Sequence, residues 1–242
     1  MEKDAYIWNI EMCEKHWWFR ARNEIIKFLI KNNIGDSDDL KILDAGCGTG
    51  TNLKMLQCFG NVSAIEPSEI VIKYARDNNP KCDIKQGLLP NSNPFSSEKF
   101  DLVTSLDVIE HIENDVEVLR HFKSILKDNG SLIVTVPAFP SIFSYADKSA
   151  HHFRRYSKKE LKKKLINAGF EKFDIYYFNT FLFIPIYSLR LFQKIFNFNV
   201  KAEDNIPNPI LNKLFFNLMN FEKHLLKYNP FGISLCVIAK ND

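Results

Sequence analysis

The 242-residue sequence lacks the features of a disulfide-rich, membrane-spanning or strongly charged protein. Its five cysteines are scattered and form no C-x-x-C pair, which favours reduced thiols in a cytoplasmic protein. Residues 175–189 carry no charge, but this run is shorter than the roughly 20 apolar residues that a membrane-spanning helix needs. The formal net charge of +3 is too small by itself to indicate a nucleic-acid partner. The first residues lack the apolar core of a signal peptide.

What the sequence does contain is a glycine turn between a predicted strand and a predicted helix. Ile42 and Leu43 give the short apolar run that is typical of a buried parallel strand. Three glycines follow at alternate positions, Gly46, Gly48 and Gly50. Glycine permits a positive φ and lets a ligand approach the backbone closely. Because backbone N–H groups and a helix N-terminus meet at such a turn, it favours an anionic ligand group.

Two acidic residues accompany this turn. Asp44 ends the first predicted strand, and Glu66 ends the second, residues 61–66, 22 positions later. This is close to the spacing at which an acidic residue meets ribose hydroxyls in Rossmann-like sites. The alternative is an ordinary surface glutamate at a strand end. Thr51 stands where the third glycine of the dinucleotide fingerprint would fall, so the match to that fingerprint is incomplete.

The rest of the chain alternates predicted strands and helices. Further strands are predicted over residues 82–86, 100–107, 131–137, 173–178 and 235–239. A helix that begins at Asp115 is predicted to end at Asn129 and Gly130, which are typical of helix C-termini. Such alternation predicts an α/β protein with a doubly wound, largely parallel sheet.

Three motifs carry a resemblance to one family. The D-x-G-x-G-x-G pattern of residues 44–50 resembles the first motif of the class I S-adenosylmethionine-dependent methyltransferases. The Val-Ile-Glu-His-Ile run at 108–112 is similar to the fourth motif of the members that act on small molecules. The His-Trp-Trp-Phe run at 16–19 and the His-His-x-x-Arg-Tyr run at 151–156 resemble a bacterial subgroup. The resemblance implies a Rossmann-like seven-stranded sheet with an antiparallel last strand. It also implies S-adenosyl-L-methionine as cofactor and S-adenosyl-L-homocysteine as product.

The resemblance further implies which residues hold the cofactor. The glycine turn would pack on its methionine part, Asp44 would lie near its amino group, and Glu66 would bind its ribose. Leu88 stands where such proteins often carry an acid beside the adenine, so apolar contacts and backbone amides are expected to hold the adenine instead. The complete expected set is Trp17, Arg20, Asp44, Ala45, Gly46, Cys47, Gly48, Gly50, Glu66, Pro67, Ser68, Gly87, Leu88, Leu106 and Asp107.

Residues 1–38 are predicted to form an N-terminal helical lid. In one interpretation its aromatic residues simply pack on the domain. In the other, Trp17 or Phe19 excludes water above the cofactor, and Arg20 or Arg22 meets a carboxylate through bidentate hydrogen bonds. The sequence pattern alone leaves both open.

Candidate bases are His111, His151, His152 and Tyr156. His111 follows the fourth strand, at the edge where open α/β sheets bind ligands, and an unperturbed histidine has a pKa of about 6.5. Alternatively, His111 hydrogen-bonds the backbone and shapes the pocket. The loop at 147–156 favours a substrate role, such as holding a phosphate or carboxylate. We expect no metal, because adjacent histidines rarely share one ion without further ligands.

The expected domain division places a helical cap, 179–232, within a Rossmann-like domain made of 39–178 and 233–242. The cap either packs as ordinary core or forms an apolar roof over the acceptor or a dock for a lipid-linked one. The basic segment 154–164 is either a solvated face or a patch for RNA or anionic lipid. No RNA-binding motif accompanies it.

The sequence therefore predicts a methyltransferase that acts on a small molecule, more readily on an oxygen than on a carbon. Candidate acceptors are a sugar, a quinone-like or polyketide-like ring, or a phosphate-bearing intermediate. Anionic and lipid-linked acceptors both fit, with peripheral membrane contact and a monomer or homodimer. An RNA methyltransferase and a non-catalytic S-adenosylmethionine-binding protein are the alternatives.

Overall fold

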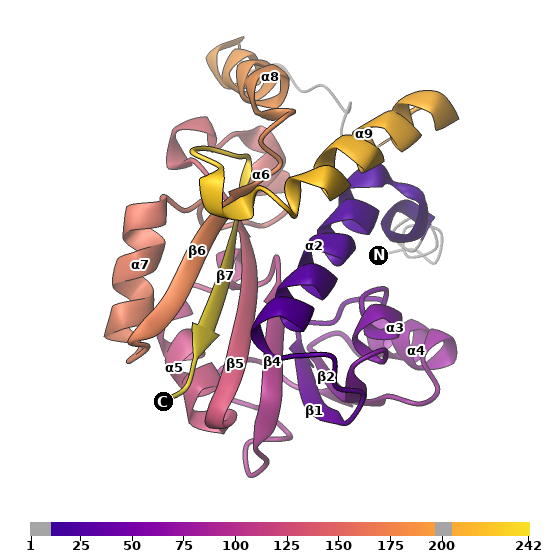
Figure 1. Ribbon diagram of the computed structural model, residues 1–242, viewed down its shortest axis with the longest axis vertical. Helices are drawn as coiled ribbons and strands as arrows, with labels where there is room; N and C mark the ends of the chain where they lie inside the picture. The colour runs from indigo at the N-terminus through magenta and orange to yellow at the C-terminus, as the bar shows by residue number, and fades with distance from the viewer. Residues whose placement is uncertain (1–10, 197–204) are drawn as a thin grey trace.

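The computed structural model describes residues 11–196 and 205–242, which form a seven-stranded sheet with helices on both faces (Figure 1). The strands are β1 (Leu40–Ala45), β2 (Gly60–Glu66), β3 (Asp83–Gln86), β4 (Phe100–Leu106), β5 (Leu126–Pro137), β6 (Lys172–Phe178) and β7 (Ser234–Lys240). Their order in the sheet is β3-β2-β1-β4-β5-β7-β6. Strands β1 to β5 pair in parallel, whereas β7 is antiparallel to both β5 and β6. The predicted fold class, including the antiparallel last strand, is confirmed.

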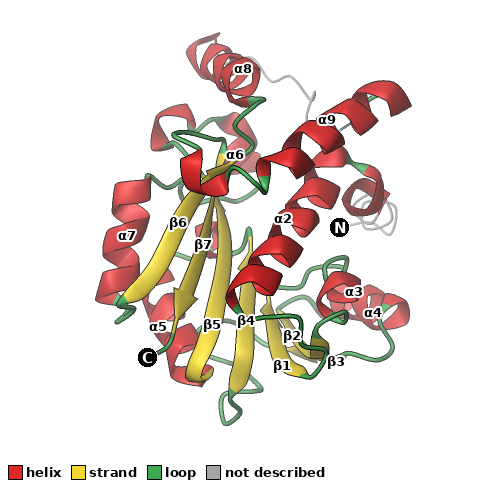
Figure 2. Ribbon diagram, in the orientation of Figure 1, coloured by secondary structure: helices red, strands yellow, loops and turns green. Residues whose placement is uncertain are grey.

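Helices connect and cover these strands, and α2 crosses the near face of the sheet in Figure 2. The helices are α2 (Trp17–Asn33), α3 (Leu53–Leu56), α4 (Glu69–Asn78), α5 (Asp115–Ile125), α6 (Tyr145–Ser149), α7 (Lys158–Asn167), α8 (Phe183–Phe196) and α9 (Pro209–Glu222). Short 3-10 turns are η1 (Ile109–His111), η2 (Pro140–Ile142) and η4 (Leu226–Tyr228). Among the described residues, no helix is long and apolar enough to cross a membrane.

The core has two layers because neighbouring residues of a strand point to opposite faces of the sheet. On β1, Ile42 packs with residues of α2, α3 and α4, whereas Leu43 packs with residues of α5 and α7. On β4, Leu102 and Val103 divide between the same two layers. Burial on both faces explains why these strands read as continuous apolar runs.

The end of α5 differs from the prediction. The helix stops at Ile125 rather than at Asn129 and Gly130, and residues 126–130 already belong to β5. Backbone hydrogen bonds tie this stretch to Asn241: the amide of Asn129 donates to Asn241 at 2.7 Å, and the amide of Asn241 donates to Gly130 at 2.9 Å. Contacts with the last residues of the chain, which local sequence does not reveal, therefore override the helix-ending signal.

The segment between β6 and β7 brings α9 against α2. The side-chain oxygen of Asn212 accepts a hydrogen bond from the amide of Trp17 at 2.8 Å, and its amide group donates to the carbonyl of Lys15 at 2.9 Å. The ring of Trp17 packs edge-on against Phe215, with centroids 5.5 Å apart. The N-terminal helix is thus fixed by the C-terminal insertion. The domain boundaries stay a prediction, and residues 1–10 of the predicted lid and 197–204 of the predicted cap lie outside the described residues.

Candidate cofactor and acceptor site

The glycine turn after β1 is packed on one side and open on the other. At Gly46, with φ +84°, a Cβ would lie 2.6 Å from a methyl carbon of Val108, so no side chain fits there. At Gly48, with φ +54°, the corresponding position has no heavy atom within 4 Å. The open space above Gly48 lies at the carboxyl edge of the sheet, where ligands bind in open α/β folds. The turn therefore fits a cofactor that lies directly on its backbone.

Glu66 borders this space at the end of β2. One carboxylate oxygen accepts a hydrogen bond from the amide of Gly48 and the other from the amide of Ser68, each at 3.1 Å. Ser68 in turn caps α4 by accepting a hydrogen bond from the amide of Val71. Partial burial raises the pKa of Glu66, and the two amides oppose that rise. The carboxylate is therefore held in place, half-buried, beside the turn.

Asp44 occupies a different position. Its side chain is buried inside the sheet, where one oxygen accepts a hydrogen bond from the hydroxyl of Thr104 at 2.6 Å. The other oxygen has no hydrogen-bond partner in the described structure. Burial raises the pKa of Asp44 to about 6. Asp44 thus supports the turn from beneath, while Glu66 lines its rim.

The arginine that faces the site is Arg22 rather than Arg20. Arg22 is only 4% exposed, forms an ion pair with Asp107, and donates to the side-chain oxygen of Asn52 at 2.9 Å. Its guanidinium lies 5.0 Å from the ring centroid of Trp18. Arg20 instead points outward on α2, exposed. Of the two arginines that the sequence offers, the packing of α2 thus turns Arg22, and not Arg20, toward Asp107.

Arg20 stacks over Phe216 of α9, with its guanidinium carbon 4.5 Å from the ring centroid. Trp17 is buried in the contact between α2 and α9. Both residues therefore contact the C-terminal insertion. These contacts favour the alternative in which the aromatic residues of the N-terminal segment pack on the domain. We do not carry either of them into the proposed cofactor site.

The other expected cofactor residues divide by exposure. Ala45, Cys47 and Leu106 are buried in the core, and burial raises the pKa of the Cys47 thiol. Gly87 donates its amide to the carbonyl of Glu66 at 3.2 Å, so the end of β3 lies beside the end of β2. Leu88 follows it and is 59% exposed, which leaves an apolar surface beside this edge. Pro67 is also exposed there. Contact of these residues with an adenine stays a prediction.

Two of the four candidate bases, His111 and His152, contact each other. The rings of His111, on η1, and His152, after α6, have centroids 4.6 Å apart. Partial burial lowers the pKa of His111, and the neighbouring His152 lowers it further. His151 is exposed, and its backbone also contacts the ring of His111. Next to His111 lies Glu110, which is fully buried and which sequence reasoning named only as part of a motif. The position of Glu110, directly before His111 and three residues after Asp107, is the sequence signal that could have marked it as a site residue.

Tyr156 is not suited to act as a base. It is fully buried, and its hydroxyl donates a hydrogen bond to Asp115 at 2.8 Å. Burial, followed by the charge of Asp115, raises the pKa of Tyr156 well above its usual range. Asp115 also pairs with Arg154 and Lys164, each at 2.8 Å. The expectation for Tyr156 is therefore corrected: its phenol stays protonated and joins a buried network beneath the loop.

This network predicts acid sensitivity. Burial by itself would raise the pKa of Asp115, but hydrogen bonds from Lys164, Arg154 and Tyr156 hold it below its usual value. A carboxyl with a lowered folded pKa contributes stability above its unfolded pKa of about 3.9, and this stability is lost as the pH falls through the lower folded value. We expect the free energy of unfolding, measured in urea, to fall below about pH 4. Asp115→Asn should be less stable at pH 7 and lose less on acidification; an unchanged pH profile would contradict this assignment.

Comparison with known proteins decides the family. Residues 15–174 match the family model described as a methyltransferase domain. The chain belongs to that family. It is 26% identical over 159 residues to a probable S-adenosylmethionine-dependent methyltransferase of Mycobacterium tuberculosis, covering 64% of this chain and 56% of that protein. It is 30% identical over 162 residues to a ubiquinone biosynthesis O-methyltransferase of Rickettsia bellii, covering 59% of this chain and 66% of that protein.

The chain therefore spans less than two thirds of the length of these curated relatives. A plantazolicin methyltransferase, solved in complex with S-adenosylhomocysteine, is 14% identical and superposes with a TM-score of 0.61. That comparison covers 99% of this chain and 90% of the other and shows the shared fold. The predicted class I methyltransferase family and its cofactor, S-adenosylmethionine, are thus confirmed at the level of the family.

Proposed function

We propose that this methyltransferase-family protein transfers a methyl group from S-adenosylmethionine to an oxygen of a small-molecule acceptor. The observation that carries the proposal is the open position above Gly48, bordered by the fixed carboxylate of Glu66. Few residue types other than an acid would accept hydrogen bonds from both ribose hydroxyls at that rim. The name of the Rickettsia relative, an O-methyltransferase, supports an oxygen acceptor.

Each part of the site has a distinct task in this proposal. The glycine turn receives the methionine portion, Glu66 the ribose, and Arg22, held by Asp107, the carboxylate end of the cofactor. The bound cofactor supplies a sulfonium methyl group that an acceptor oxygen attacks in line. Orientation and exclusion of water account for much of the expected acceleration. In this proposal His111 or His152, whose rings lie next to one another, takes the acceptor's proton.

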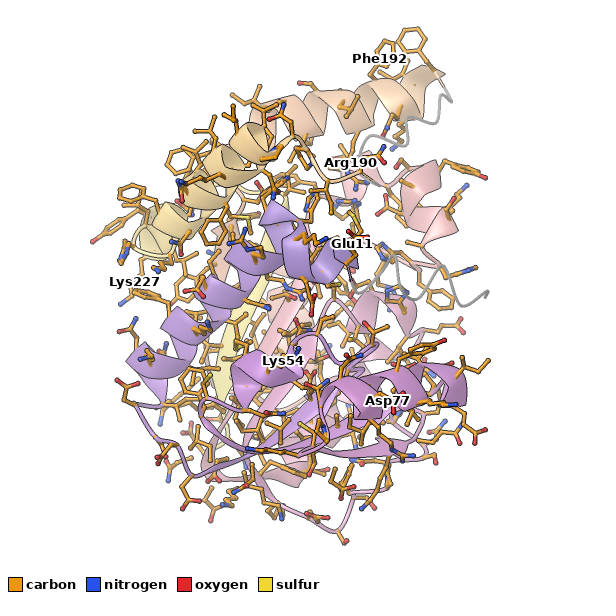
Figure 3. All side chains as sticks on the ribbon, turned by 90° about the vertical axis from the view of Figure 1, so that its right-hand side faces the viewer. Glu11, Lys54, Asp77, Arg190, Phe192 and Lys227 are labelled. Carbon is orange, nitrogen blue, oxygen red and sulfur yellow. The ribbon has the colours of Figure 1, made fainter. Side chains whose placement is uncertain are left out.

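The helical insertion supports an apolar or lipid-linked acceptor. Large apolar side chains are exposed along α8 and α9, and Phe192 projects away from the body of the protein (Figure 3). They include Ile184, Phe192, Ile195 and Phe196 on α8, and Ile210, Leu214 and Phe221 on α9. Of the two charged residues of α8, Lys194 is exposed, whereas Arg190 turns inward and pairs with Asp147. An exposed apolar face of this kind suits peripheral contact with a lipid surface.

A methyl-transfer assay tests the acceptor class. The protein would be incubated with methyl-tritiated S-adenosylmethionine and, separately, with phenols bearing a long apolar chain, short-chain phenols, sugar phosphates and total RNA. We expect label to pass to the long-chain phenols and to be recovered as a methyl ether. Label incorporated into RNA would favour the alternative that uses the basic 154–164 segment. Label in none of the acceptors, despite cofactor binding, would favour a non-catalytic binding protein.

A further inference from the structure

A group of potential metal ligands lies beside the proposed acceptor site. Glu110, His111 and His152 each offer one ligand atom, and these atoms all lie within 4.8 Å of one another. Glu110 and His111 belong to η1, whereas His152 comes from the loop after α6, 41 positions further along the chain. The fold therefore gathers side chains from two separate segments at one point. The loop that carries Asp107 leads directly into this group.

The environment of the Glu110 carboxylate is unusual. Its side chain is fully buried, and neither carboxylate oxygen has a hydrogen-bond partner in the described structure. Burial of an unpaired carboxylate is costly, and buried polar groups in proteins are nearly always satisfied. The two cationic side chains whose charges act on Glu110, Arg22 and Arg155, are already engaged by Asp107 and Asp147 respectively. A bound cation would supply a partner for the carboxylate oxygen that faces His111 and His152.

A carboxylate orients the ring of His152, as is usual for metal-binding histidines. One of its ring nitrogens, Nδ1, lies 3.2 Å from a carboxylate oxygen of Asp147. The same oxygen accepts a hydrogen bond from Nε of Arg155 at 2.8 Å, and the other oxygen accepts one from the amide of Ser144 at 2.9 Å. A carboxylate that fixes one imidazole nitrogen orients the ring and leaves the second nitrogen for a metal.

We propose that Glu110, His111 and His152 bind one divalent transition-metal ion of the zinc type. Two imidazole nitrogens and one carboxylate oxygen suit zinc, cobalt or iron better than magnesium or calcium, which prefer oxygen ligands. Ligands of one such ion lie about 3.3 Å apart, so the group must contract when the ion binds. The ring of His111 is open to solvent on one side, which leaves room for the group to contract. Three protein ligands leave a fourth position open on the exposed side of the group.

The open position gives the ion a role in the proposed reaction, and this role rests on the proposed function. With both imidazoles bound to the ion, neither His111 nor His152 takes the acceptor's proton; an acceptor hydroxyl bound to the ion loses its proton to water instead, because the ion stabilises the alkoxide or phenoxide. The oxygen then forms a bond to the methyl carbon while the carbon–sulfur bond breaks, and the electron pair stays on the sulfur of S-adenosylhomocysteine. No oxidant or reductant is required. The ion would thus orient the acceptor and supply the nucleophile.

Metal titration of the full chain tests the site. Chelator-treated protein would be titrated with Co²⁺, whose visible absorption reports a site of low coordination number, and with Zn²⁺ in competition. We expect one ion per chain for the wild type. The variants Glu110→Gln and His152→Ala should each lower the affinity by more than about 100-fold, because loss of a direct ligand exceeds the usual outer-shell effect. His224→Ala, which removes an exposed imidazole that follows α9 and contacts Phe28 of α2, should bind as the wild type does.

Two results would overturn the site. One is that the wild type binds no stoichiometric Co²⁺, and the other is that both ligand variants bind Co²⁺ with the affinity of the wild type. His152→Ala removes a partly exposed side chain, so it serves as the test if Glu110→Gln unfolds. Titration with S-adenosylhomocysteine separates this inference from the proposed function. Cofactor binding without metal binding leaves the methyltransferase proposal intact, whereas metal binding without cofactor binding leaves only the metal site.

Discussion

Replacing Glu66 with alanine is expected to weaken S-adenosylhomocysteine binding at least about 100-fold while the protein stays folded. A hydrogen bond to a charged group contributes about 1.5–3 kcal/mol, and the carboxylate would accept two from the ribose. The variant also loses the hydrogen bonds that fix the amides of Gly48 and Ser68. Because Glu66 lies half-buried at a strand end, its removal leaves no cavity in either core layer.

Calorimetric titration measures this effect, and Glu69→Ala is the matched control. Glu69 lies three positions later, in the first turn of α4, and is exposed. Its removal deletes one carboxylate of the same region without touching the glycine turn. Near wild-type affinity in Glu66→Ala, with normal thermal unfolding, would contradict the assignment of Glu66 to the ribose.

The second large effect concerns stability. Asp147→Ala is expected to lower the free energy of unfolding by about 3–5 kcal/mol, which is the usual cost of removing one partner of a buried ion pair. Asp147 is buried, and its partner Arg155, 2.8 Å away, would keep a buried charge with no counterion. Arg190 lies 3.5 Å from the same carboxylate and loses that ion pair too. The midpoint of thermal unfolding should fall by about 10 °C for a chain of this size.

Asp128→Ala provides the comparison, because Asp128 is an exposed aspartate on the surface of β5. Its removal should change the free energy of unfolding by no more than about 0.5 kcal/mol. Equal unfolding midpoints for Asp147→Ala and the wild type would show that Arg155 finds other partners, and the loop before α7 would then not depend on this ion pair.

The strands and turns that the sequence predicts correctly are those that a few adjacent residues specify. The apolar run at Ile42 and Leu43, the glycines after it and the acid at Glu66 each report a strand, a turn or a strand end. The antiparallel strand β7 was expected from the family resemblance and not from its own residues. The end of α5 was missed because contacts of Asn241 decide it.

The parts of the site that were missed depend on tertiary packing. Arg20 and Arg22 are two positions apart and look equivalent in the sequence, but α9 covers one side of α2 and leaves Arg22 to face Asp107. The sequence marks Tyr156 as a candidate base on the loop at 147–156, but its hydroxyl is buried and donates a hydrogen bond to Asp115. The unpaired carboxylate of Glu110 could not be recognised without knowing what surrounds it.

The central claim, that the open space above Gly48 is a site for S-adenosylmethionine, is tested most directly by calorimetric titration of the wild-type chain with S-adenosylhomocysteine, with NADH as the control ligand. The account predicts one site with a dissociation constant near micromolar, which corresponds to about −8 kcal/mol, and no response to NADH. No heat with S-adenosylhomocysteine, or tighter binding of NADH, would contradict it.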